Sequence, residues 1–177
     1  MQITINTSTR YNKMLKNILT LFFLTLPFAV LSQIKNPEYK EILDDLYQHS
    51  VPLISVDSLK HLKNVYLLDA REKEEYNVSH LKNARNVGYI WFDMRRVVNI
   101  PKDADVVVYC SVGYRSEKIA EKLIKNGFQK VHNLYGGIFE WVNEHQPVYK
   151  TNGVQTSEIH TYNKNWSKWI TNGTKVN

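Results

Sequence analysis

The sequence predicts an α/β domain built on a mostly parallel sheet with helices on both faces. Two short runs, 65–68 and 106–109, are continuously apolar, and a third run at 131–134 is more mixed. Runs that are apolar on both faces suit strands of a parallel sheet that helices cover. An amphipathic helix predicted at 116–126 separates the last two runs, so that strand, helix and strand form one unit. Such alternation is typical of the α/β class.

The elements ahead of this unit follow from capping and periodicity. Asn36 and Pro37 are suited to the cap and first turn of a helix. The apolar residues that come next recur at helical spacing, at Tyr39, Ile42, Leu43, Leu46 and Tyr47. We therefore expect a helix within residues 33–49 that leads into the domain. A short strand is predicted at 53–55 and a short helix at 57–62.

Three residues far apart in the sequence are expected along one edge of the sheet. Asp69 and Cys110 each directly follow an apolar run, and Gly136 comes just after the third run. In open α/β sheets, functional sites form beyond the carboxyl ends of the strands. We therefore expect a site at the edge where Asp69, Cys110 and Gly136 meet.

The N-terminus has the pattern of an export signal. Three basic residues, Arg10, Lys13 and Lys16, precede an apolar run at 18–31, and no acidic residue precedes Glu38. This pattern predicts a signal peptide at 1–32 with cleavage before Gln33, and an exported protein that is periplasmic or secreted. The run is short for a membrane span, so we expect no stable membrane insertion after cleavage. An uncleaved membrane anchor is the alternative, and Met14 is an alternative start.

Composition narrows the remaining functional classes. The formal charge of +6 falls to +3 without the three basic residues of the predicted signal. No cluster of basic residues with interleaved aromatics is present, so nucleic-acid binding is not predicted. The histidines show no metal-ligand spacing, so no metal site is predicted. With a single cysteine in the sequence, the chain cannot form an internal disulfide.

Residues 151–177 differ in composition from the domain that precedes them. They are polar and rich in Asn and Thr, with Trp166 and Trp169 embedded among them. No strong periodicity predicts a helix or strand here. Because large aromatic side chains gain free energy on burial, we expect this polar C-terminal tail to dock on the domain through its tryptophans.

The lone thiol, Cys110, lies where a nucleophile would be useful. It follows a predicted buried strand and opens a loop that contains Gly113 and ends at the predicted helix. Strand, glycine-containing loop and helix together aim backbone N–H groups at an anion. Here the anion would be a thiolate or the sulfur group that it carries. A buried, inert cysteine is the alternative, but the loop favours a chemical role.

Four segments together resemble the rhodanese sulfurtransferases, over roughly residues 50–148. The active-site loop of that family is similar to 110–116 here, and its other landmarks occur in the same order at 67–71 with Glu75-Tyr76, at 79–84, and at 134–137 with Trp141. The sequence departs from the family pattern at Ser79, Lys82 and Asn83. The resemblance implies a mostly parallel five-stranded sheet and a rhodanese-like domain at 50–150.

The resemblance also implies a persulfide cycle that needs no cofactor. Cys110 would take sulfane sulfur from an anionic donor such as thiosulfate and pass it to cyanide, a thiol or a protein acceptor. Arg115 would bind the donor's oxygens, and Asp69 and Arg71 would support the loop. The other loop residues would bind the substrate: Ser111, Val112, Gly113, Tyr114 and Ser116.

Two other functions are alternatives to this one. Phosphatases that share the fold have five residues between cysteine and arginine, whereas four separate Cys110 from Arg115. The shorter loop suits a sulfur atom better than a phosphoryl group. The second alternative is a sulfur-relay or redox module that exchanges sulfur or electrons with a partner protein and has little turnover of its own.

Overall fold

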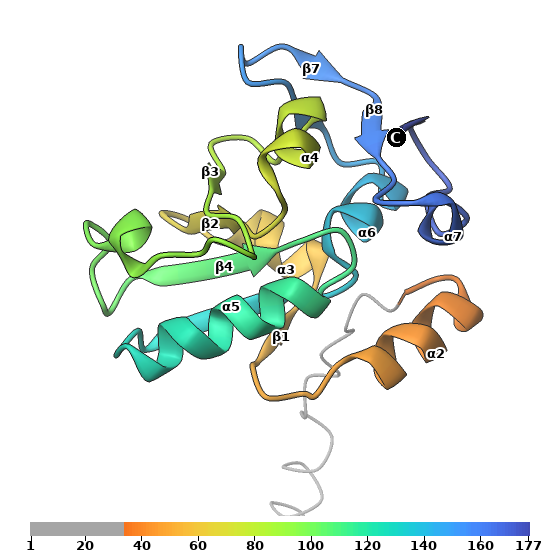
Figure 1. Cartoon of the computed structure of the whole chain (residues 1–177). Coiled ribbons are helices and arrows are strands. Elements are labelled where there is room, and N and C mark those ends of the chain that lie inside the picture. The colour runs from red at the N-terminus through yellow and green to blue at the C-terminus, as the bar shows by residue number, and fades with distance from the viewer. Residues whose placement is uncertain (1–33) are drawn as a thin grey trace, which may run out of the picture. The chain divides into compact units, whose positions relative to one another are not determined.

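A five-stranded parallel sheet forms the centre of the domain in the computed structural model, which describes residues 34–177 (Figure 1). The predicted signal at 1–32 lies outside the described residues. The strand order is β1-β5-β4-β2-β3, and every neighbouring pair is parallel. The strands are β1 (Leu53–Ile54), β2 (Tyr66–Asp69), β3 (Arg85–Asn86), β4 (Asp105–Tyr109) and β5 (Lys130–Leu134). The predicted fold class is confirmed.

Helices pack on both faces of the sheet against the apolar side chains of β4. Val107 and Tyr109 belong to a buried cluster that includes residues of α2 (Pro37–Leu46), α3 (Val56–His61) and α6 (Gly137–Asn143). Val106 and Val108 belong to a second cluster with α5 (Tyr114–Lys125) and the 3₁₀ helix η1 (Met94–Val97). Successive side chains of a strand point to opposite faces, which explains why this run is apolar at every position.

Helix α2 begins and packs as its sequence indicates. The Asn36 side chain accepts hydrogen bonds from the backbone N–H groups of Glu38 and Tyr39, at 3.0 and 3.2 Å. Tyr39 and Leu43 are buried on its inner face. The Tyr39 ring stacks on Trp169, with 5.3 Å between ring centroids. The N-terminal helix and the C-terminal tail therefore pack against each other.

The tail contains more regular structure than its sequence indicates. It holds β7 (Gln155–Thr156), β8 (Glu158–His160), α7 (Lys164–Ser167) and β9 (Thr174–Val176). Strand β7 pairs antiparallel with β6 (Val148–Tyr149), and β8 pairs parallel with β9. Each element is too short to show a periodicity in sequence. Trp169 and Ile170 are buried, whereas Trp166 is half-buried.

Several other elements were missed for similar reasons. Strand β3 has two residues, and α4 (Lys73–Val78) has six. Helix α6 begins at Gly137, directly after Gly136, and a glycine pair suggests a turn rather than a helix. The apolar character of Trp141 predicts a core residue. In the structure it is half-buried, and its Nε1 donates to the Pro147 carbonyl at 2.9 Å. Within residues 34–177, no helix is long and apolar enough to cross a membrane.

Candidate active site

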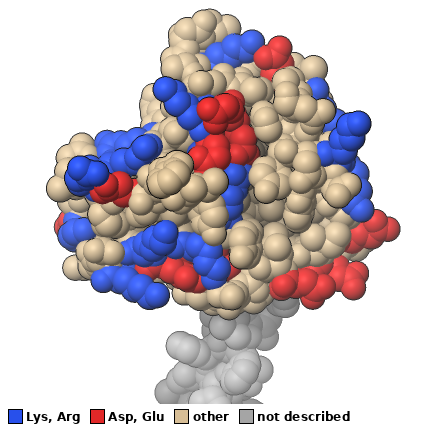
Figure 2. All heavy atoms as spheres, in the orientation of Figure 1, with Lys and Arg blue, Asp and Glu red and all other residues tan. Residues whose placement is uncertain are grey.

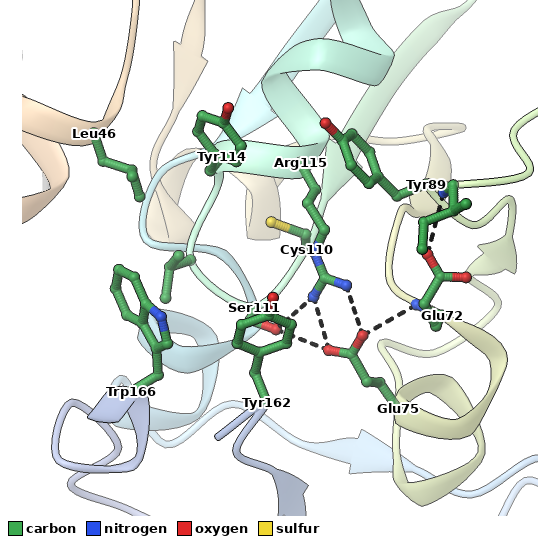
Figure 3. A pocket seen from close by; sticks show the side chains of 12 residues that line it. Leu46, Glu72, Glu75, Tyr89, Cys110, Ser111, Tyr114, Arg115, Tyr162 and Trp166 are labelled. Atoms are coloured by element: carbon green, nitrogen blue, oxygen red, sulfur yellow. Dashed lines mark hydrogen bonds and ion pairs between the residues drawn. The ribbon is translucent and has the colours of Figure 1, made fainter. Parts of the chain in front are cut away.

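Cys110 lies at the carboxyl end of β4, at the floor of a pocket of about 370 Å³. The residue is only 1% exposed, so the pocket is the route by which a small molecule reaches its sulfur. The Gly113 N–H donates a hydrogen bond to Sγ at 3.1 Å. Helix α5 begins at the next residue, so its N-terminal end faces the sulfur and favours negative charge there. Figure 3 shows the sulfur pointing toward the side of the pocket where Tyr114, Leu46 and Trp166 lie.

Two glycines allow the loop to take this shape. Gly113 has φ +110°, and a Cβ there would overlap the Tyr47 hydroxyl oxygen. Gly137 has φ +59°, and a Cβ there would overlap the carbonyl oxygens of Cys110 and Ser111. This close approach lets the Ile138 N–H donate to the Cys110 carbonyl at 2.9 Å. The glycine pair at 136–137 therefore anchors the first residues of the Cys110 loop.

Side chains from other elements hold the loop from beneath. The Tyr47 hydroxyl donates to the Val112 carbonyl at 2.5 Å and accepts from the Gly136 N–H at 3.0 Å. Asn133 Nδ2 donates to the Gly113 carbonyl at 2.9 Å, and Ser116 Oγ donates to Asn133 Oδ1 at 2.7 Å. The carbonyl groups of Val112 and Gly113 therefore both have hydrogen-bond partners, as buried polar groups require.

The predicted substrate-binding residues do not all reach the pocket. Ser111, Val112, Tyr114 and Arg115 line it. Ser116 was predicted to bind substrate, but it is fully buried, and its hydroxyl is used to hold the loop. Gly113 is also among the residues predicted to bind substrate. Within residues 34–177, the pocket lining includes neither Gly113 nor Ser116, and Gly113 acts on Sγ through its backbone N–H.

Arg115 is held in a bidentate ion pair with Glu75 of α4. Its Nη1 and Nη2 donate to the two carboxylate oxygens at 2.6 and 2.8 Å, and Nη2 also donates to Ser111 Oγ at 3.0 Å. Burial raises the pKa of Glu75, but the hydrogen bond and charge of Arg115 outweigh this and lower it. Burial lowers the pKa of Arg115, and Glu75 more than reverses this. Both terminal nitrogens expected to meet the donor's oxygens are therefore already paired.

Asp69 and Arg71 form a second, fully buried ion pair. Arg71 Nη2 donates to Asp69 Oδ2 at 2.6 Å and to the Ser79 carbonyl at 2.6 Å. Their link to the Cys110 loop runs through β4. The Ala70 N–H donates to the Tyr109 carbonyl at 2.8 Å, and the Arg71 guanidinium lies 5.9 Å from the centre of the Tyr109 ring. The pair supports the strand end that carries Cys110.

The pocket lining is largely apolar and comes from five parts of the chain. Figure 2 shows acidic and basic side chains meeting at a hollow near the middle of this face, with uncharged surface beside it. Glu72 lines the pocket together with the Arg115–Glu75 pair. The uncharged lining residues beyond the loop are Leu46, Tyr89, Ile90, Tyr162 and Trp166.

Sequence reasoning missed Glu75 and these wall residues as site residues. Glu75 belongs to the segment after Arg71, but nothing local shows that it pairs with a side chain 40 positions away. The helical spacing of Leu46 predicts a residue packed on the inner face of a helix. Tyr162 lies in a segment without periodicity, so its sequence predicts no position for its side chain. Within residues 34–177, no group of three or more His, Cys, Asp or Glu side chains is arranged to hold a metal ion. What the site offers is a lone sulfur nucleophile facing a pocket.

Comparison with known proteins identifies relatives of the domain. Residues 55–144 match the family described as Rhodanese-like domain. A sulfurtransferase from Allochromatium vinosum is 33% identical over 95 residues, which cover 54% of this chain and 88% of that protein. A tRNA uridine(34) hydroxylase from Buchnera aphidicola is 32% identical over 94 residues, which cover 50% of this chain. The match spans 29% of the hydroxylase, so the two share one domain.

A solved structure supports the same fold. The crystal structure of thiosulfate sulfurtransferase from Pseudomonas aeruginosa superposes with a TM-score of 0.54 at 20% sequence identity. The superposition covers 64% of this chain and 22% of that protein. At this level of identity, the likeness is one of fold. Residues 34–54 and 145–177, which supply Leu46, Tyr47, Tyr162 and Trp166, lie outside the segment that matches the family.

Proposed function

This chain belongs to the rhodanese-like domain family, which includes sulfurtransferases, and we propose that it is itself a sulfurtransferase with Cys110 as the sulfur carrier. It would accept sulfane sulfur from an anionic donor, for which thiosulfate is the simplest test compound. It would deliver this sulfur to a thiol or to cyanide. The observation that carries the proposal is the position of Sγ, at the floor of an open pocket and at the N-terminal end of α5.

The reaction divides into two displacements at sulfur. The Cys110 thiolate attacks the outer sulfur of thiosulfate, the S–S bond of the donor breaks, and sulfite leaves with the electron pair. The product is a persulfide on Cys110 that carries one negative charge. An acceptor thiolate or cyanide then attacks the outer sulfur, and the Cys110 thiolate leaves. This is covalent catalysis through one nucleophile.

The loop stabilises negative charge in each of these states. The Gly113 N–H already donates to Sγ, and the start of α5 presents further N–H groups without helical partners. A thiolate and a persulfide each carry a single negative charge, which matches a helix N-terminus. The buried supports of the loop, Tyr47 and Asn133, keep these donors in place. The site is therefore organised before the substrate arrives.

Sulfur transfer is tested with purified protein, donor and cyanide. Thiocyanate formation with donor and cyanide, and an adduct of about 32 Da on the protein with donor alone, are expected from the wild type, and both should be absent from Cys110→Ser. The serine variant is nearly isosteric with cysteine, so the fold should persist. Wild-type protein that forms no sulfur adduct with any sulfane-sulfur donor would refute the proposal.

Relay to a partner protein is the second candidate for the same cysteine. Ile90 lines the pocket and is 68% exposed, and its neighbour Trp91 is 81% exposed. Exposed large apolar residues beside a reactive site are typical of contact surfaces. A persulfide that forms on Cys110 but turns over slowly with cyanide and small thiols would favour relay over free-standing catalysis.

Export of the protein is a separate proposal, based on the N-terminal sequence. The basic residues followed by the apolar run at 18–31 support cleavage before Gln33. Fractionation of the native host, with N-terminal sequencing of the mature protein, tests it. A protein that retains residues 1–32 and sediments with membranes would indicate an uncleaved anchor instead.

A further inference from the structure

We propose that the sulfur donor is an organic sulfane-sulfur compound with an apolar body and no more than one negative charge. This inference rests on the proposed sulfurtransferase activity and names the substrate class of the same pocket. It follows from two properties of the pocket: the charge of its lining and the origin of its walls. Both make thiosulfate, a small dianion, a poor match.

The charged side chains of the pocket do not form a dianion site. Among residues 34–177, the lining includes one guanidinium, Arg115, and two carboxylates, Glu72 and Glu75. Glu75 pairs with both terminal nitrogens of Arg115 and balances its charge, which leaves the charge of Glu72 uncompensated within the lining. A dianion in this pocket would lose hydration and gain no free cation in return. One negative charge on the sulfur itself is different, because the loop and the start of α5 face that atom.

The apolar walls offer contact area to the remainder of the donor. Leu46 lies at the end of α2, and Tyr162 and Trp166 come from the tail, with Trp166 in α7 (Figure 3). Tyr162 lies with its ring centre 5.0 Å from the Arg115 guanidinium, so one face of that cation is covered as well. These aromatic and aliphatic side chains line the approach to Cys110. Such walls bind flat or apolar groups and cannot replace the hydration of a second negative charge.

The wall residues lie outside the segment that matches the family. The family match ends at residue 144 and begins at residue 55, whereas Leu46, Tyr162 and Trp166 flank it on both sides. The tail is fixed to the domain by the stacking of Trp169 on Tyr39 and by the buried Ile159. The wall is therefore formed by ordered segments that flank the family match and line the pocket of Cys110.

Three donors separate the effects of body and charge. Benzenethiosulfonate and methanethiosulfonate each carry one negative charge, share one leaving-group chemistry and differ in the apolar body. Thiosulfate adds the second charge. In each case the Cys110 thiolate attacks the outer sulfur, the S–S bond breaks, and a sulfinate or sulfite leaves with the electron pair. With cyanide as the common acceptor, kcat/KM for the donor reports binding and attack together.

The contribution of the donor's apolar body is tested with substitutions in the pocket wall and a control outside it. The wild type should prefer benzenethiosulfonate to methanethiosulfonate by about tenfold. Trp166→Ala should reduce that preference by about three- to tenfold, the value of one aromatic contact. Val154→Ala is the control in the same tail, because Val154 is exposed and lies outside the lining of this pocket. If Trp166→Ala lowers the melting temperature, Tyr162→Ala at a 52% exposed position provides the same readout.

The contribution of the donor's charge is tested with single substitutions at two glutamates. Glu72→Gln keeps an oxygen for the hydrogen bond from the Ile90 N–H and removes one negative charge from the pocket. It should raise kcat/KM for thiosulfate by about three- to fivefold relative to methanethiosulfonate, the effect of one charge at pocket distances. Glu74 is an exposed residue on α4. Glu74→Gln should leave kcat/KM for thiosulfate and for methanethiosulfonate unchanged.

The outcomes distinguish this inference from the proposed function. Equal use of the phenyl and methyl donors by the wild type, or a preference unchanged in both wall variants, would overturn the inference while the Cys110 persulfide still forms. A wild type that uses thiosulfate better than either thiosulfonate would overturn it too. Failure of all three donors to form the persulfide would instead overturn the sulfurtransferase assignment.

Discussion

Replacing Tyr47 with phenylalanine removes one oxygen atom and two hydrogen bonds from beneath the Cys110 loop. The hydroxyl donates to the Val112 carbonyl and accepts from the Gly136 N–H, and Tyr47 is only 5% exposed. Leaving a buried backbone group without a partner costs about 1–3 kcal/mol. Tyr47→Phe leaves two such groups, and an entering water molecule would restore part of the lost hydrogen bonding. We therefore expect the substitution to lower the free energy of unfolding by about 2–4 kcal/mol.

The same substitution should slow sulfur transfer. Tyr47 joins the Cys110 loop to the glycine turn at 136–137, so its loss allows the Gly113 N–H to shift relative to Sγ. We expect kcat to fall by about tenfold or more in conditions where the variant is folded, as for a lost preorganised donor. Urea denaturation measures the first effect, and thiocyanate formation at low denaturant measures the second.

Tyr135→Phe is the matched control for this experiment. The Tyr135 hydroxyl contacts the surface residue Asp44 at 3.1 Å, so its loss should cost less than about 1 kcal/mol. The reasoning is refuted if Tyr47→Phe and Tyr135→Phe have the same stability. It is also refuted if Tyr47→Phe is destabilised but retains the wild-type rate, because the hydroxyl would then hold the fold and not the loop geometry.

Two further predictions concern backbone and charge. Gly137→Ala should cost more than about 3 kcal/mol and most of the activity, because its Cβ would overlap the Cys110 carbonyl oxygen. Gly127→Ala, also at positive φ but with open space around the Cβ, should cost about 1–2 kcal/mol; equal losses by urea denaturation would contradict the steric explanation. Burial, with Glu144 nearby, raises the pKa of Glu140 to about 7. The folded state thus holds a proton that the unfolded chain has released, so stability should fall as pH rises from about 4.5 to 7. Glu140→Gln should remove about 1–2 kcal/mol of that fall, measured by denaturation at pH 5 and pH 8, and an unchanged pH profile would show that Glu140 titrates normally.

The sequence alone determined the core of the α/β domain. Strand β4 is buried on both faces and β2 is buried or half-buried along its length, so both sequences are largely apolar, and α5 carries a regular apolar stripe. Local rules of this kind act over a few residues and are visible without a structure. They also identified Cys110, because a lone thiol between a buried strand and a helix start is a local pattern.

Only the tertiary structure decided what surrounds that thiol. The Arg115–Glu75 pair joins residues 40 positions apart, and the Tyr47 hydrogen bond to Val112 joins residues 65 apart. Leu46 and Trp166 come from opposite ends of the described chain to form one wall. Such contacts depend on how helices and tail pack on the sheet, and no short-range periodicity encodes them. The nucleophile is therefore determined by local sequence, whereas the charge and shape of its pocket arise from long-range packing.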